Sequence, residues 1–380
     1  MSERSRWFRV ALCFGLPLVL VGCMKHTVEV GGEKVRFEPP KVVSPLSTAS
    51  LSNPGEVWQR YRGAAIDPRV REVPAAIQEG IKTDPDRYLP ELVAFLVEDA
   101  DDDFHAVKRL HDWVTDNIVY DTERVVSGTV TADSVGLTNV LKSGLSVCAG
   151  YANVFRAMVE LAGFEVETVS GHARGYGFDA FGPEDVTTAN HAWNAVRIDG
   201  EYYLVDTTWD AGSSSIGTRV FTPRYSTKYL FLAPEAFLFT HFPTDPNWQL
   251  LDVPVSPESF VGLPQLKGQF FETGLQLKTP LARVNPVGST TRVRVAVPEG
   301  KLLLAELQST KGETYAHGTK LHEIGSETDV LVIFPEPGDW VLVLYVGSAA
   351  EHSGYSSYKY DFAGRFAFNA SEGSPIRFTN

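Results

Sequence analysis

Three side chains of this 380-residue chain have the types and spacing of a thiol acyl-transfer site: Cys148, His191 and Asp206. Apolar residues follow Cys148 at intervals of three and four, which predicts a helix that ends near Gly163. With Ser146 as its N-cap, this helix has Cys148 in its first turn, where free amides and the positive helix end lower the pKa of a thiol. A thiolate is the nucleophile that acyl transfer needs.

His191 and Asp206 lie on either side of a predicted β-hairpin. Asp199-Gly200 separates two alternating runs, and this dipeptide is a strong signal for a two-residue turn. In that register His191 faces Thr208, and Asp206 lies two positions away on the same sheet face, within ~7 Å of its diagonal neighbour. Asp206 can therefore hold the imidazole in one tautomer and leave the other ring nitrogen for the thiol.

The chain has three cysteines, and we expect Cys148 alone to remain as a free thiol in the mature protein. A basic start and the short apolar run 10–21 are typical of a cleaved secretory leader. The run ends in Leu20-Val21-Gly22-Cys23, which resembles the lipobox of bacterial lipoproteins. This resemblance implies loss of Cys13, acylation of Cys23 and a lipid anchor in the cell envelope. Met24 follows in place of an Asp, so the outer membrane is favoured over the inner if the host has two.

Composition and periodicity divide the chain into five segments. We expect a signal peptide over 1–22, a tether over 23–55 and a catalytic domain over 56–252. A Pro-rich linker over 253–264 then leads to a β-sandwich domain over 265–380. Helices come first and an antiparallel sheet follows, so the fold class is α+β with a trailing all-β sandwich of immunoglobulin type.

The helices and strands expected within these domains follow from local patterns. Helical periodicity covers 56–118, with a helix start at the acidic run Asp101-Asp102-Asp103, and a Ser/Thr/Gly-rich loop is expected over 126–138. One short alternating stretch, 27–37, predicts a strand in the tether. Later alternating runs predict the other strands, at 165–170, 192–198, 202–208, 292–297, 330–334, 340–346 and 358–368.

Charge and histidine placement exclude other classes of function. The net charge is -13 and no Lys/Arg cluster occurs, so a nucleic-acid binder is not expected. Most histidines are scattered without zinc-ligand spacing (His105, His241, His317, His322 and His352), and His111 suits a capping or packing role on its helix. No metal and no cofactor are predicted.

Several sequence blocks resemble the transglutaminase-like branch of papain-type cysteine enzymes, and most closely the kyphoscoliosis peptidase group. The resemblance covers about residues 80–252 and more loosely the β-rich tail. It implies a papain/transglutaminase-like core of helices on an antiparallel sheet, with Cys148 as nucleophile, His191 as general base and then acid, and Asp206 as orienter. Asp210 stands where the group has Gly, which bears on local loop shape. The blocks are His111-Asp112-Trp113-Val114, 117–121, 170–177, Asp206-Thr207-Thr208-Trp209, His241-Phe242-Pro243 and 248–251.

Other side chains around these blocks have two readings each. Tyr120 and Tyr151 either line a cleft or pack in the core, and packing is the simpler interpretation. Trp193 and Trp209 flank the hairpin, where they pack and could shield the site. His172 follows a Gly in an expected loop and has a substrate-rim or a structural role.

The function expected from these features is thiol-dependent chemistry on peptide amides through a thioester. The substrate is a peptide or protein, and peptidoglycan stem peptides suit the compartment. Whether water or an amine accepts the acyl group is open, and so is the second oxyanion donor. An alternative is a non-catalytic scaffold that binds peptides or proteins with the same fold, and a further one is a purely structural surface lipoprotein. Oligomeric state is open.

Overall fold

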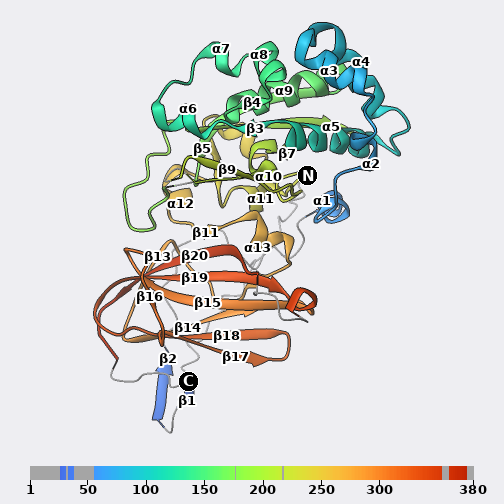
Figure 1. Ribbon diagram of the computed structural model, residues 1–380. Coiled ribbons are helices and arrows are strands. Elements are labelled where there is room, and N and C mark those ends of the chain that lie inside the picture. The colour runs from blue at the N-terminus through green and yellow to red at the C-terminus, as the bar shows by residue number, and fades with distance from the viewer. Residues whose placement is uncertain are drawn as a thin grey trace, which may run out of the picture.

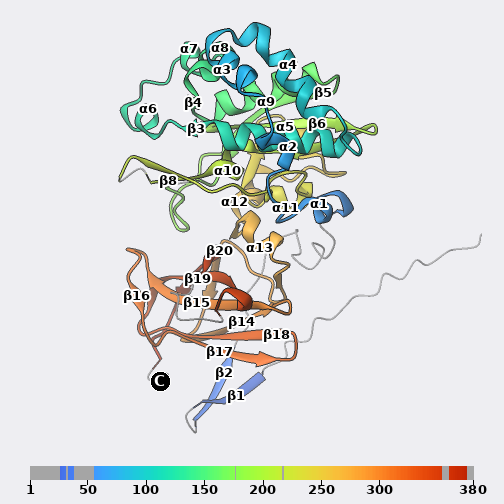
Figure 2. The same ribbon diagram turned by 45° about the vertical axis from the view of Figure 1, so that its right-hand side comes forward.

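The computed structural model describes residues 26–30, 33–37, 55–175, 177–215, 218–352 and 359–374. They form a helix-rich lobe and an all-β lobe, one above the other in Figures 1 and 2. The leader and Cys23 lie outside the described residues. Among the helices described, none is both long enough and apolar enough to cross a membrane.

The tether contains a hairpin where one strand was predicted. Strand β1 (His26–Val30) pairs antiparallel with β2 (Glu33–Phe37). The stretch 27–37 therefore contains two short paired strands in place of one, with Val30 opposite Glu33.

Five helices open the first lobe, as the periodicity of 56–118 predicts. They are α1 (Glu56–Tyr61), α2 (Pro68–Arg71), α3 (Ala75–Thr83), α4 (Pro85–Val97) and α5 (Asp103–Asn117). The Asp102 side chain accepts a hydrogen bond from the His105 amide at 2.8 Å, so the helix start predicted at the acidic run is confirmed.

The loop predicted over 126–138 is wrong in part, because three short helices occupy this region. They are α6 (Thr122–Ser127), α7 (Ala132–Val135) and α8 (Leu137–Ser143). The Asp121 carboxylate accepts from the Arg124 amide, and Thr131 and Ser134 form a reciprocal capping box. Thr131 and Ser134, which belong to the Ser/Thr-rich stretch that suggested a loop, therefore serve as a helix cap.

A four-stranded antiparallel sheet in the order β10-β5-β6-β7 packs against helix α9 (Cys148–Leu161). Its strands are β5 (Glu165–Ala173), β6 (His191–Ile198), β7 (Glu201–Val205) and β10 (His241–Pro243). Asp199 and Gly200 have φ of 53° and 89°, and Ile198 pairs with Glu201, so the predicted two-residue turn is confirmed. Shorter elements complete the lobe: β3 (Val119–Tyr120), β4 (Leu145–Ser146), α10 (Thr207–Ala211), β8 (Gly212–Ser215), β9 (Val220–Pro223), α11 (Pro234–Phe237) and η2 (Pro246–Gln249).

The second lobe consists of two packed sheets. One has the order β12-β14-β18-β17 and the other β11-β20-β19-β15-β16, and β13 pairs parallel with β20. This arrangement matches immunoglobulin sheets ABED and C′CFG, with β14, β15, β18, β19 and β20 as B, C, E, F and G. The strands are β11 (Gln265–Leu266), β12 (Gln276–Leu277), β13 (Val284–Val287), β14 (Thr290–Ala296), β15 (Lys301–Ser309), β16 (Thr314–Tyr315), β17 (Thr319–Ile324), β18 (Glu327–Ile333), β19 (Gly338–Ser348) and β20 (Asp361–Ala370).

The segment between the lobes is packed. The predicted linker 253–264 contains helix α12 (Pro257–Val261), and Phe260 and Leu263 are buried. Helix α13 (Gly268–Glu272) follows β11, and the 3-10 helix η3 (Ala349–His352) follows β19. One apolar cluster runs from Trp193 of β6 to Phe366 of the sandwich. The lobes therefore share buried surface, and the domain boundaries themselves stay predictions.

Candidate active site

Cys148 is the first residue of helix α9. The N-cap is Val147, without a side-chain cap, so the expectation of Ser146 as N-cap is wrong. Ser146 belongs to β4, where its hydroxyl donates to the Ser134 carbonyl at 3.3 Å. A Cβ at Gly150 would lie 1.9 Å from Ser146 Oγ, so the first turn of α9 packs tightly on this serine. The amide of Cys148 is one of the helix-end donors that have no acceptor in the preceding turn.

His191 and Asp206 come together at one end of the sheet. His191 begins β6, and its Nε2 lies 2.7 Å from Asp206 Oδ2. The strand predicted to run to Thr208 ends at Val205, because Asp206 Oδ1 accepts from the amides of Thr208 and Trp209 and so starts helix α10. The carboxylate thus caps a helix with one oxygen and holds the imidazole with the other.

Asp206 has a fourth donor that the sequence reading missed. His241 Nε2 lies 3.1 Å from Asp206 Oδ2, and both side chains are buried. Strand β10 places His241 opposite Ala173 of β5, and β5 lies between β10 and β6, the strand that carries His191. A histidine counted among scattered ones therefore lies in the site, and its only sequence signal was the block His241-Phe242-Pro243.

Charges within this group favour an ion pair between sulfur and imidazole. Burial raises the pKa of the Cys148 thiol, but a hydrogen bond and the charge of His191, with the Ala192 amide, together lower it. Burial lowers the pKa of His191, yet Asp206 and Cys148 outweigh this and raise it to about 10. Although burial opposes it, contact with His191 and His241 holds the pKa of Asp206 well below its usual range. Burial lowers the pKa of His241 to about 4, although its contact with Asp206 opposes this.

Of the aromatic residues predicted near the site, Tyr151 and Trp193 are buried in the core and Trp209 is partly exposed. Tyr151 is fully buried and its hydroxyl donates to the Ile118 carbonyl, so it packs in the core and lines no surface. Trp193 is 1% exposed, with its ring 6.1 Å from that of His191. Trp209 is partly exposed and lies 5.5 Å from His191. Trp209 is therefore the aromatic side chain that covers the imidazole and also faces solvent.

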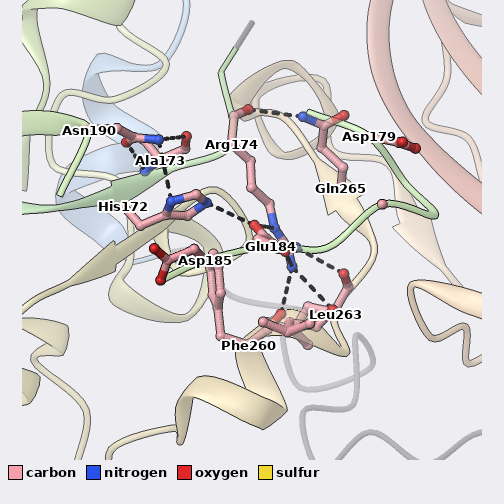
Figure 3. Close-up of polar contacts among 12 residues, drawn as sticks. His172, Ala173, Arg174, Asp179, Glu184, Asp185, Asn190, Phe260, Leu263 and Gln265 are labelled. Carbon is pink, nitrogen blue, oxygen red and sulfur yellow. Dashed lines mark hydrogen bonds and ion pairs between the residues drawn. The ribbon is translucent and has the colours of Figure 1, made fainter. Parts of the chain in front are cut away.

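His172 has a structural environment. Its Nε2 lies 2.9 Å from Glu184 Oε1, and its Nδ1 accepts from Asn190 at 3.3 Å (Figure 3). Asn190 Oδ1 also accepts from the Ala173 amide at 2.7 Å. These contacts tie the segment before His191 to strand β5 and so help to set the position at which β6 begins.

Glu184 and Arg174 form a buried hub under this segment. Arg174 donates to both oxygens of Glu184, at 2.8 and 2.9 Å, and to the carbonyls of Phe260 and Leu263 at 2.7 and 2.9 Å (Figure 3). Arg283 of the β lobe adds a contact to Glu184 Oε2 at 3.1 Å. Despite burial, His172 and the two arginines lower the pKa of Glu184 to about 2. The β lobe therefore braces the chain that leads to His191.

A second buried network supports Asp206 from behind. Asp210, where the resemblance expects Gly, accepts from Ser226 and from the Lys228 and Tyr229 amides, and His111 Nε2 lies 3.1 Å away. His111 thus packs, as predicted from its helix. The carboxylate of Asp210 thus holds the segment 226–229 next to helix α10. These hydrogen bonds accommodate an Asp at the position where the resemblance expects Gly.

In the described part of the chain, one group of three metal-type ligands occurs: His191, Asp206 and His241, with ligand atoms within 4.8 Å of one another. Hydrogen bonds from both imidazoles to one carboxylate oxygen account for this closeness. Cys148 is the free cysteine of the described residues.

Comparison with known proteins places this site in a family context. Residues 90–207 match the family described as the transglutaminase-like superfamily. Kyphoscoliosis peptidase of Mus musculus is 34% identical over 187 residues, which is 49% of this chain and 28% of the relative. Cytokinesis protein 3 of Schizosaccharomyces pombe is 25% identical over 163 residues, 42% of this chain and 18% of that protein. A solved structure of a TGase is 18% identical, covering 35% of this chain and 32% of its own, with a TM-score of 0.26. The chain thus spans less than a third of the length of these relatives.

Proposed function

Because residues 90–207 form a transglutaminase-like domain, we propose that the chain is a thiol hydrolase or acyltransferase that acts on peptide amides. Cys148 is the nucleophile, His191 the general base and acid, and Asp206 the orienting carboxylate. The observation that carries this proposal is the 2.7 Å contact between His191 Nε2 and Asp206 Oδ2, beside a thiol at the start of helix α9 whose pKa His191 lowers.

The proposed reaction has two steps. The Cys148 thiolate attacks the amide carbonyl carbon, the C–N bond breaks, and the amine leaves with the proton of His191, which yields a thioester. Water or an amine then attacks the same carbon, His191 takes its proton, and the C–S bond breaks. The products are a carboxylic acid or a new amide and the regenerated thiolate.

Local structure supports each role in this sequence. The thiolate lies at the first position of α9, where the helix dipole and the Ala192 amide stabilise negative charge. The amide of Cys148 is free to donate to the oxyanion that forms at the carbonyl oxygen. Asp206 stays ionised through four donors and keeps the imidazole in the orientation that the proton transfers need.

The proposal places this activity at a bacterial envelope through a lipid on Cys23, with protein or peptidoglycan peptides as substrates. It rests on the leader and the Leu20-Val21-Gly22-Cys23 motif. With Cys23→Ala, radiolabelled palmitate should no longer enter the protein, and the protein should leave the membrane fraction. Equal labelling of both proteins would refute the anchor.

The reactivity of Cys148 tests the catalytic proposal. Its rate of alkylation by iodoacetamide would be measured from pH 5 to 10 in the wild type, in His191→Ala and in the exposed control His322→Ala. The wild type and the control should react well below pH 8, whereas the His191→Ala thiol, whose pKa burial still raises, should titrate at or above the ordinary value of about 8.5. A wild-type thiol that reacts only above about pH 8 and ignores the loss of His191 would favour the non-catalytic scaffold.

A further inference from the structure

Lys267 of the β lobe reaches the candidate active site from outside the transglutaminase-like domain. Its Nζ lies 3.9 Å from the centre of the Trp209 ring, and the same ring lies 5.5 Å from that of His191. One aromatic side chain therefore separates the ammonium of Lys267 from the imidazole. Cys148, Trp209 and Lys267 are all partly exposed.

The environment of Lys267 lacks a counter-ion among the described residues. Its Nζ donates to the Arg174 carbonyl at 2.7 Å, and no carboxylate lies within 4.0 Å of it there. The Gln265 amide donates to the same carbonyl at 2.9 Å, as Figure 3 shows. Burial of part of this ammonium costs desolvation free energy, and the carbonyl and the ring do not compensate it as an ion pair would. Such an environment is unusual for a lysine with a purely structural role.

A second cation without a carboxylate partner lies on the neighbouring strand. Arg365 of β20 pairs in register with Gln265 of β11, two residues before Lys267. Antiparallel partners share one sheet face, so Gln265 and Arg365 lie on the same face. Lys267 follows β11, and its Nζ donates to the same Arg174 carbonyl as the Gln265 amide. Within the described residues Arg365 makes no ion pair, and its buried Nε has no hydrogen-bond partner. Arg174, by contrast, is neutralised by Glu184.

We propose that Lys267 and Arg365 form an anion subsite that binds a carboxylate of the peptide whose amide Cys148 attacks. The substrate class is then a peptide with a free carboxylate close to the scissile bond. This assignment rests on the proposed function and extends it from the transglutaminase-like domain to the β lobe. Lys267 and Arg365 are specificity residues, since they contact the substrate away from the reacting atoms.

The charges around Lys267 make the subsite sensitive to pH. Burial and the nearby cations Arg365 and Arg174, although opposed by Asp206, lower the pKa of Lys267 to about 7. His241 also faces the lysine and stays neutral above about pH 4. Carboxylate binding should therefore weaken between pH 6.5 and 8.5 as Lys267 loses its proton.

Protection of Cys148 against iodoacetamide tests the subsite. The probes are acetyl-alanyl-alanine with a free carboxylate and the same dipeptide as its amide, each titrated at pH 6.5. The half-protecting concentration is referred to the unprotected rate of each protein. In the wild type the free acid should protect at a concentration at least ~10-fold lower than the amide, as expected for a charge-assisted contact.

Variants separate the subsite from a packing role of the lysine. Lys267→Met and Arg365→Gln should each reduce the preference for the acid at least threefold, while Lys278→Met, an exposed lysine of the same lobe, should keep it. Lys267→Arg should keep the preference at pH 8.5, where that of the wild type falls. Equal protection by acid and amide, protection by neither, or a preference that survives both substitutions would overturn the proposal. The unprotected pH–rate profile reports the function of Cys148 separately, so the two proposals fail independently.

Discussion

Replacement of Arg174 by Met should destabilise the protein far more than the same change at an exposed arginine. The guanidinium of Arg174 is buried and makes a bidentate pair with Glu184, together with hydrogen bonds to the carbonyls of Phe260 and Leu263. Met keeps an apolar stem over the ring of Phe260, which lies 4.2 Å from the guanidinium carbon. The substitution therefore removes the charge and the donors with little loss of packing.

The expected cost follows from burial. Removal of one partner from a buried ion pair costs about 3–5 kcal/mol, because the other charge stays buried and uncompensated. Glu184 would retain His172 and Arg283, which places the loss toward the lower end of that range. An exposed pair is worth about 0–1 kcal/mol. Arg197 and Glu165 form such a pair, 3.0 Å apart, with side chains 47% and 56% exposed.

Urea unfolding at pH 7 measures both variants against the wild type, followed by tryptophan fluorescence and by far-UV circular dichroism. Arg174→Met should lower the free energy of unfolding by about 3 kcal/mol. Arg197→Met should leave it nearly unchanged. A difference between the two variants below about 1 kcal/mol would refute the view that the buried pair of Arg174 and Glu184 stabilises the fold.

Three further predictions concern the site and its supports. Amide cleavage should fall as the pH rises through about 10, because the raised pKa of His191 sets the point at which the imidazolium proton needed by the leaving amine is lost; a pH–rate profile flat to pH 11 would contradict this. His241→Phe removes a donor to the buried Asp206 carboxylate and should cost about 1.5–3 kcal/mol in urea unfolding, against little change for the exposed His322→Phe. Gly171→Ala would put a Cβ 2.3 Å from the Phe242 carbonyl oxygen and 2.6 Å from the Trp193 ring. It should therefore lower the free energy of unfolding by about 1–3 kcal/mol and weaken the β5–β10 pairing. The control is Gly288→Ala, where the added Cβ has nothing within 4 Å and the change should be near neutral.

The sequence by itself determined the parts of this protein that depend on near neighbours. Asp199-Gly200 predicts its turn because both residues tolerate positive φ, and the structure has 53° and 89° there. The acidic run predicts the start of α5, because a carboxylate caps free amides within three residues. The periodicity after Cys148 predicts a helix, which the structure begins at that residue.

Local reasoning was less reliable where one residue type serves two structures. Ser and Thr over 126–138 suggested a loop, yet Thr131 caps helix α7 there. The strand after Gly200 was predicted to reach Thr208, but the Asp206 side chain takes the next amides and starts a helix. In both cases the competing states differ by a hydrogen bond or two, which composition does not resolve.

Only the tertiary structure decided which distant side chains meet at the thiol. His241 reaches Asp206 because β10 pairs with β5. In this pairing His241 lies opposite Ala173, which is 68 residues earlier in the chain. Lys267 lies over Trp209 because the two lobes share one apolar cluster. Such contacts arise from the burial of surfaces far apart in sequence, and neither residue has a local pattern that distinguishes it from a solvent-exposed His or Lys.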